Sequence, residues 1–314
     1  MELIVSIIAL TKGDVLIVKT SLIGSILSNL LLVTGMCFFL GGFERPEQFF
    51  NETAAGTAAN LLAAAVSCFI IPTAFNLAAS TDKNSIPPIS RGMAIILLVV
   101  YGCYLLFQLK THANFYNKES RKVRRQPWCR RFTKFREDLA PATPSDIERQ
   151  PIVDNDTHEP ELHICVATII LIVSTAVVGL CSEFMVGSIE SFTATTNVSA
   201  EFIGLILLPI VGNAVEHITA VKVACKDRMD LAISVAVGSS MQIALLVIPF
   251  VTVLGWAMGN DEMTLSFDIF QIVIMFVSVW VVNYLISDGK SSKHFPMSSS
   301  PDNITADSEN FRLA

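Results

Sequence analysis

Two glutamates stand at equivalent positions of a duplicated segment. The first copy reads ELIVSIIALTKGDVLIVKTSLIGSILSNLLLV from Glu2, and the second reads EHITAVKVACKDRMDLAISVAVGSSMQIALLV from Glu216. The copies align without a gap, and their matched positions include Lys12 with Lys226, Gly24 with Gly238, Ser25 with Ser239, and Leu31–Val33 with Leu245–Val247. An acid inside an apolar stretch, repeated in two halves of a chain, is typical of an ion-transport site.

The composition assigns the chain to the membrane. Of its 314 residues, 52% are hydrophobic and 16% charged, whereas soluble domains carry about 25% charged residues. The apolar runs are continuous rather than alternating, which indicates helices and not the strands of a barrel. We therefore predict an all-α polytopic membrane protein with about seven full spans plus a half helix, namely Glu2–Leu10, Val15–Leu40, Ala54–Ala79, Gly92–Leu109, Leu162–Val186, Phe202–Ala224, Leu231–Met258 and Phe267–Ile286.

A polar linker divides the spans into two groups. We predict a first membrane repeat over 1–110, a basic then acidic linker over 111–161, a second repeat over 162–287 and a disordered polar tail over 288–314. The cluster of Lys and Arg in the linker places it in the cytoplasm. The two copies begin on the first and sixth helical segments, so they cross the membrane in opposite directions. This is an inverted repeat, and such repeats build transporters with a site at mid-depth.

Counting residues brings polar side chains to one depth. Glu216 lies ten residues before Lys226, or about 15 Å, which is half the thickness of the hydrocarbon layer. The same count from the following turn brings Ser239 and Gln242 to this level, and the first copy brings Glu2 and Ser25 there, with Ser28 or Asn29. Carboxylates, hydroxyls and amides form an all-oxygen set, which suits Ca²⁺ or Mn²⁺.

A helix break is expected just before Glu216. Pro209, Gly212 and Asn213 should interrupt the helix there and release backbone carbonyls for coordination. Pro72 and Pro249 should kink two other spans.

Two carboxylates at mid-depth suggest exchange. Each must be protonated or neutralised by a cation, because an unpaired charge is costly away from water. One Ca²⁺ balances two carboxylates, and so do two protons, so the same pair binds either but not both. The alternative is that these polar residues only join helices. His217 could relay protons or simply pack, and Glu183 could guide ions at the mouth opposite the linker or lie at a solvated helix end.

Several stretches resemble the Ca²⁺/H⁺ exchanger (CAX) family of fungal and plant vacuoles, within the Ca²⁺/cation antiporter superfamily. They are SLIGSILSNLLLVTGMCFFLGG, YGCYLLFQLKTH, SEFMVGSIE, EFIGLILLPIVGNAVEH and GSSMQIALLVIPFVTVLGWAMG. The resemblance implies an inverted-repeat antiporter in the vacuolar membrane, with Ca²⁺ and H⁺ as substrates, membrane lipid around it, and no nucleic-acid partner or cofactor. It also implies an ion site formed by Glu2, Ser25, Ser28, Asn29, Gly212, Asn213, Glu216, Ser239 and Gln242.

The resemblance also implies an incomplete chain. In the family the first repeat begins with Gly-Asn before the acid, as Gly212 and Asn213 stand before Glu216, whereas here Met1 occupies that region. One more family span would follow the region around Lys290. We therefore expect truncation at both ends and keep three hypotheses: a Ca²⁺/H⁺ antiporter, a non-transporting partner or regulator of full-length exchangers, and a Na⁺-coupled Ca²⁺ exchanger. Motifs of intramembrane enzymes such as HExxH and GxSxG do not occur, so we expect no enzymatic activity.

Overall fold

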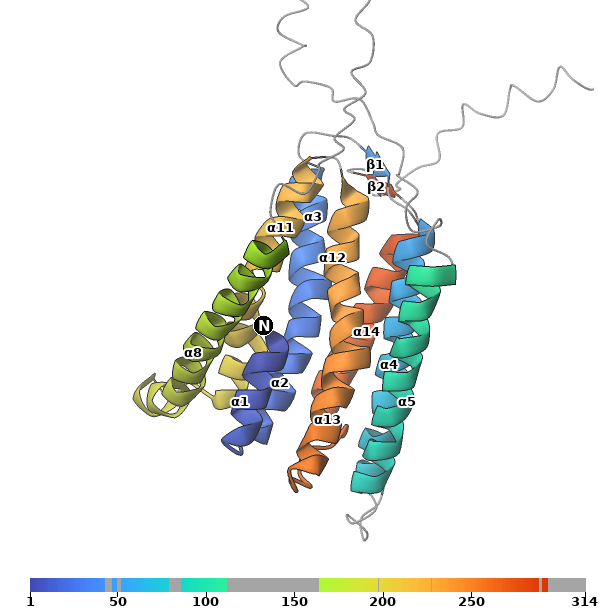
Figure 1. Cartoon of the computed structure of the whole chain (residues 1–314). Helices are drawn as coiled ribbons and strands as arrows, with labels where there is room; N and C mark the ends of the chain where they lie inside the picture. Colours follow the sequence, from blue (N-terminus) through green and yellow to red (C-terminus); the bar gives the residue numbers. More distant parts are fainter. Residues whose placement is uncertain are drawn as a thin grey trace, which may run out of the picture.

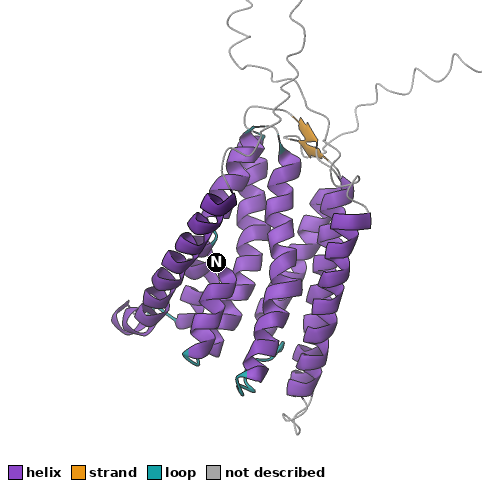
Figure 2. Ribbon diagram, in the orientation of Figure 1, coloured by secondary structure: helices purple, strands orange, loops and turns teal. Residues whose placement is uncertain are grey.

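A computed structural model describes eight stretches of the chain: 1–42, 47–49, 52–78, 86–111, 164–196, 198–226, 228–287 and 290–292. They are almost entirely helical (Figure 2). Most of the predicted linker and most of the tail lie outside the described residues. The prediction of an all-α membrane protein is confirmed, since six helices in the described stretches are long and apolar enough to cross a membrane, or seven if one bent pair counts as a span.

The first repeat contains one short helix and three long helical segments. The short helix α1 spans Glu2–Thr11, and its ten residues are about half a span. The next segment runs without interruption through α2 (Val15–Leu27), the π-helical η1 (Ser28–Val33) and α3 (Thr34–Gly41). It is followed by α4 (Glu52–Ala78), then α5 (Ile86–Leu106) with η3 (Phe107–Thr111).

The second repeat begins with the long helix α8 (Ile164–Thr196). A broken segment follows, made of α9 (Ala200–Phe202), η4 (Ile203–Leu207), α10 (Leu208–Gly212) and α11 (Ala214–Cys225). The last segments are α12 (Met229–Gln242) with η5 (Ile243–Val247) and α13 (Ile248–Ala257), and then α14 (Ile269–Ser287). All predicted spans therefore exist as helices. Most ends shift by up to six residues, whereas α8 continues ten residues past the predicted end at Val186.

The duplication seen in the sequence recurs in the helix pattern. α1 corresponds to α11, α2 to α12, η1 to η5, and α3 to α13. Each pair begins and ends within about two residues of the positions that the alignment of the two copies makes equivalent. The turn between α1 and α2 lies at the bottom of Figure 1, whereas α11 ends and α12 begins at the top. The amino terminus lies about halfway up the bundle (Figure 1). The two repeats therefore run in opposite directions, with Glu2 near the middle.

Prolines follow the wide π turns rather than breaking the helices. Pro209 comes shortly after η4 and Pro249 shortly after η5. A proline has no N–H to donate and its ring crowds the preceding turn, and a π turn relieves both constraints. However, η1 is π-helical without any proline, so the wide turn belongs to the repeat. Pro72 stays inside the continuous helix α4, where the expected kink does not interrupt the helix.

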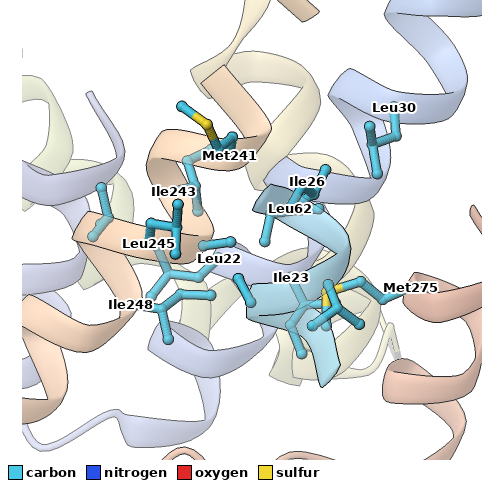
Figure 3. Close-up of a cluster of buried hydrophobic side chains, with 14 of the residues drawn as sticks. Leu22, Ile23, Ile26, Leu30, Leu62, Met241, Ile243, Leu245, Ile248 and Met275 are labelled. Atoms are coloured by element: carbon cyan, nitrogen blue, oxygen red, sulfur yellow. The ribbon is translucent and has the colours of Figure 1, made fainter. Parts of the chain in front are cut away.

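The core lies between the two repeats. Leu22, Ile23 and Ile26 of α2 meet Leu245 and Ile248 of the second repeat in one buried cluster (Figure 3). Leu62 from α4 and Met275 from α14 belong to the same cluster. The core therefore joins the repeats and does not belong to either one.

Two glycines let the broken segment approach α2. A Cβ on Gly24 would overlap the Leu205 carbonyl oxygen and the Pro209 ring, and a Cβ on Gly204 would overlap the Thr20 hydroxyl. Small residues at such crossings allow helix backbones to come close. The crossing brings the helix break beside α2.

A small sheet joins the repeats at one end of the bundle. β1 (Glu47–Phe49) pairs antiparallel with β2 (Lys290–Ser292), so that Glu47 faces Ser292. The sequence analysis expected no strands and assigned 290–292 to a disordered tail, so this pairing was missed. Three-residue strands carry too short a pattern to be read from the sequence. The remainder of the tail lies outside the described residues.

The Gly24 crossing predicts a stability difference between two glycine substitutions. Gly24→Ala should destabilise the bundle by roughly 1–3 kcal/mol, because the new methyl group must displace backbone. Gly35→Ala is the matched control, since a Cβ on Gly35 in α3 meets nothing within 4 Å and alanine favours the helix by about 1 kcal/mol. Thermal unfolding of both variants in detergent measures the difference. Equal melting temperatures would contradict the close approach.

Candidate functional site

The Glu2 carboxylate lies against the break in the second repeat. Its Oε1 is 3.4 Å from the position that a Cβ would occupy on Gly212. The charges of Glu216 and of the amino terminus act on it. The Ser25 hydroxyl faces the same carboxylate, but neither Ser25 Oγ nor Glu2 Oε1 has a hydrogen bond of normal geometry. Residues from α1, α2 and α10 therefore meet around one carboxylate.

The expected interruption before Glu216 is present. The helices Ala200–Gly212 and Ala214–Cys225 meet at an angle of 53°. Asn213 lies at the corner with φ −98° and ψ 12°, and its N–H donates to the Pro209 carbonyl at 2.9 Å. Glu216 follows in the first turn of α11, where the unpaired N–H groups of a helix start favour negative charge.

Buried polar atoms without partners gather at these residues. Seven such side-chain atoms occur in the described part of the chain, and five belong to residues predicted for the site: Glu2 Oε1, Ser25 Oγ, Asn29 Oδ1, Asn213 Nδ2 and Glu216 Oε2. Buried polar groups in proteins are nearly always hydrogen-bonded, and each exception calls for a reason. A ligand-binding site provides such a reason, because its ligating atoms have no partner until the ligand binds.

Hydrogen bonds between the repeats hold the remaining site residues. Asn29 Nδ2 donates to Ser239 Oγ at 2.9 Å, so η1 of the first repeat is joined to α12 of the second. Ser28 Oγ lies 3.1 Å from His217 Nε2. Ser28 and Asn29 thus both contact the second repeat. Counting residues along the helix had left open which of the two lies at the depth of the glutamates. His217 is buried and joined to a site residue.

Gln242 and Glu183 are placed differently. Gln242 is exposed on α12 and lines a cavity of about 210 Å³ with Gly238 and Tyr101, where Tyr101 lies within hydrogen-bonding reach. Glu183 is exposed on α8, and its backbone carbonyl accepts a hydrogen bond from Lys12 Nζ at 3.3 Å. The structure therefore does not bring the Glu183 carboxylate together with Glu2 and Glu216 in the described residues.

Two further residues were missed by the sequence analysis. Ser240 is fully buried, and its hydroxyl lies 3.5 Å from the Ile26 carbonyl of α2. Its position beside Ser239 in a Gly-Ser-Ser run was a signal that it also faces a neighbouring helix. Lys19 is a charged residue inside an apolar span, and that alone marks it as unusual.

The donor set is oxygen-rich and holds few charges. Within the described ranges, no three His, Cys, Asp or Glu side chains form a group that could hold a metal ion. Any cation bound here would therefore combine the two glutamates with neutral hydroxyl, amide and carbonyl oxygens. Such a mixed oxygen set suits hard cations such as Ca²⁺.

Known proteins resemble the chain over most of its length. A vacuolar calcium ion transporter of Schizosaccharomyces pombe is 40% identical over 291 residues, which cover 92% of this chain and 63% of that protein. The chain thus spans somewhat under two thirds of this relative. A Ca²⁺/H⁺ antiporter of Aphanothece halophytica is 39% identical, with 93% of this chain and 73% of that protein covered.

Solved structures agree with the fold. The structure of native YfkE matches with a TM-score of 0.70 and 31% identity, covering 93% of this chain and 73% of that one. A crystal structure of the H⁺/Ca²⁺ exchanger CAX shares the fold with a TM-score of 0.58 at 11% identity. The model of the sodium/calcium exchanger protein family matches residues 1–110 and 166–299. Those ranges cover the first predicted repeat and, from residue 166 onward, the second, with Glu2 and Glu216 inside them, and the chain belongs to the sodium/calcium exchanger protein family.

Proposed function

We propose that the chain carries the ion site of a Ca²⁺/H⁺ antiporter that moves Ca²⁺ into the vacuole against protons. The observation that supports this most directly is the pair of buried, unpaired carboxylate oxygens of Glu2 and Glu216. They come from inverted repeats, and the transport sites of such folds lie between the repeats. Alternating access to the two sides would then carry each ion across.

The physical basis of the exchange is charge balance. Two ionised carboxylates whose charges act on each other are unfavourable in a bundle of apolar helices. Binding one Ca²⁺ or two protons removes the imbalance, and each excludes the other. A pH difference of one unit across the membrane supplies about 1.4 kcal/mol for each proton moved, which can drive Ca²⁺ uphill.

The site residues take separate roles in this proposal. Glu2 and Glu216 bind the cation or the protons. Neutral oxygens come from Ser25, Ser28, Asn29 and Ser239. Gly212 and Asn213 at the helix break add backbone and amide oxygens. Gln242 would receive ions from the neighbouring cavity, His217 would pass protons through Ser28, and Glu183 would act at the mouth opposite the linker.

The names of the relatives support the choice of ions and membrane. Besides the fungal and cyanobacterial proteins, a vacuolar cation/proton exchanger of Oryza sativa is 35% identical over 295 residues. These proteins are described as calcium transporters, Ca²⁺/H⁺ antiporters and vacuolar cation/proton exchangers. A cytoplasmic linker, as the basic residues between the repeats indicate, would orient the site for transport out of the cytoplasm.

Transport by purified chain tests the proposal. In vesicles with an acidic interior, the chain should accumulate ⁴⁵Ca²⁺, and Glu216→Gln should abolish uptake because the amide can neither release a proton nor balance a cation. Glu201→Gln is the matched control, since Glu201 is exposed in α9 of the same broken segment and should keep wild-type uptake. Collapse of the pH gradient should stop uptake.

Three outcomes would contradict parts of the proposal. Equal uptake by Glu216→Gln and wild type would exclude the assigned acid. Uptake driven by a Na⁺ gradient without a pH difference would identify Na⁺ as the coupled ion. Absence of uptake by a folded chain, together with altered transport by a co-reconstituted full-length exchanger, would identify a partner or regulator.

Competition between Ca²⁺ and protons predicts a pH-dependent affinity. Ca²⁺ should raise the melting temperature of the chain, and its apparent Kd should increase as pH falls, because protons occupy the same carboxylates. The increase should reach up to about tenfold per pH unit for each proton displaced. Thermal shifts at several pH values measure it. The Glu216→Gln variant should show a weaker dependence, and a Kd independent of pH would contradict shared binding.

A further inference from the structure

The ammonium group of Lys19 is held by backbone and hydroxyl oxygens of the second repeat. Lys19 lies on α2, and its Nζ donates to the Glu262 carbonyl at 3.1 Å, to Thr264 Oγ1 at 3.2 Å and to the Ser266 carbonyl at 3.1 Å. The side chain is half-buried. Three acceptors satisfy the three N–H groups of an ammonium, so the contact is complete.

A charge at this position is costly and is not required by the repeat fold. Ionisable groups inside membrane segments are expensive and are usually functional. The residue equivalent to Lys19 in the second repeat is Ile233, which is almost completely buried (1% exposed). An apolar side chain therefore fits the same place in the same helix, and the charge serves something specific to the first repeat.

The partner of Lys19 is the connection between α13 and α14. Helices α4 and α5 also hold this connection: Thr73 accepts from the Phe267 N–H at 3.2 Å, Asn76 donates to Ser266 Oγ at 3.0 Å, and Arg91 forms an ion pair with Asp261. Lys19 adds a contact from α2, the helix that leads into the site. Ser25 follows six residues later, or about 9 Å along the helix.

The equivalent connection of the first repeat is fastened in another way. It lies between α3 and α4 and contains β1, which pairs with β2 beyond α14. Both equivalent connections are thus attached to the opposite repeat, one by a pair of strands and the other by an ammonium group. The two attachments lie at opposite ends of the bundle, with the sheet at the top of Figure 1.

We propose that Lys19 is a positioning residue that fastens α2 to the α13–α14 connection and thereby keeps Ser25, Ser28 and Asn29 in place against the second repeat. The lysine does not touch the ion. Its effect on transport rests on the proposed exchange function, whereas its effect on the connection does not.

Thiol labelling tests the fastening without any transport. Met263 lies in the connection, buried against Gly255, so a cysteine there reacts only when the connection opens. In a full chain whose seven native cysteines are replaced, Lys19→Ile should raise the maleimide labelling rate of Met263→Cys at least about tenfold, the change expected from losing hydrogen bonds to a charged group. Lys12→Met is the matched control, because within the described residues the Lys12 ammonium makes a hydrogen bond only to α8, and the variant should leave the rate unchanged.

A second variant keeps the test decisive if Lys19→Ile does not fold. Thr264→Val removes one of the three acceptors while conserving shape, so it should raise labelling by less than Lys19→Ile. Combining the two should add nothing beyond Lys19→Ile, because both act on one contact. Wild-type labelling in Thr264→Val alone would overturn the fastening, and so would an additive increase in the double variant.

Transport kinetics test the positioning role. Lys19→Ile should raise the KM for Ca²⁺ several-fold with a smaller change in maximal rate, because misplaced site oxygens weaken binding first. Lys12→Met should keep the wild-type KM. An unchanged KM in Lys19→Ile, with raised labelling, would overturn the positioning of the site. Absence of exchange by the unmodified chain would contradict the proposed function and leave the labelling result intact.

Discussion

Two acids that lack partners inside an apolar bundle set the central constraint on this protein. Glu2 and Glu216 each leave a carboxylate oxygen buried and without a hydrogen bond. Such groups destabilise a folded protein unless something neutralises them. The surrounding structure does not remove the imbalance by supplying a lysine or arginine, because the described ion pair, Arg91 with Asp261, lies elsewhere. The charge of the amino terminus acts on Glu2, and in the proposed site a cation or protons from outside would neutralise what remains.

The inverted repeat explains how the two acids meet, and its departures from symmetry show what each half adds. Gly24 is packed tightly against the broken segment, whereas a Cβ on the equivalent Gly238 would meet nothing within 4 Å. Lys19 is charged, whereas its equivalent Ile233 is a core residue. Duplication supplies two similar halves, and single residues then make the two ends of the bundle different. These differences give each end of the bundle its own set of contacts.

A common ion site for Glu2, Ser25 and Glu216 stays a prediction made from distance along a helix. The sequence predicted the spans and the break at Asn213, since these depend on hydropathy and proline chemistry. It did not predict which way each side chain turns. Counting gave Gln242 the depth of Ser239, but it could not show that Gln242 is exposed beside Tyr101. Helices that are apolar on all sides carry little rotational signal. The β1–β2 pairing joins residues far apart in the chain, so no local pattern predicts it.

Asn29 shows how the repeats could keep the site ready for a cation. Its Nδ2 is engaged by Ser239 of the other repeat, whereas its Oδ1 is buried and has no partner. An amide held by its nitrogen keeps a fixed orientation, so a free oxygen is available without the cost of reorganising the side chain. The hydrogen bond between the repeats therefore joins the two halves and also orients an oxygen of the proposed site. A hydroxyl could also donate to Ser239 and offer its lone pairs, but from a single oxygen, whereas the amide places the donor and the acceptor on two separate atoms.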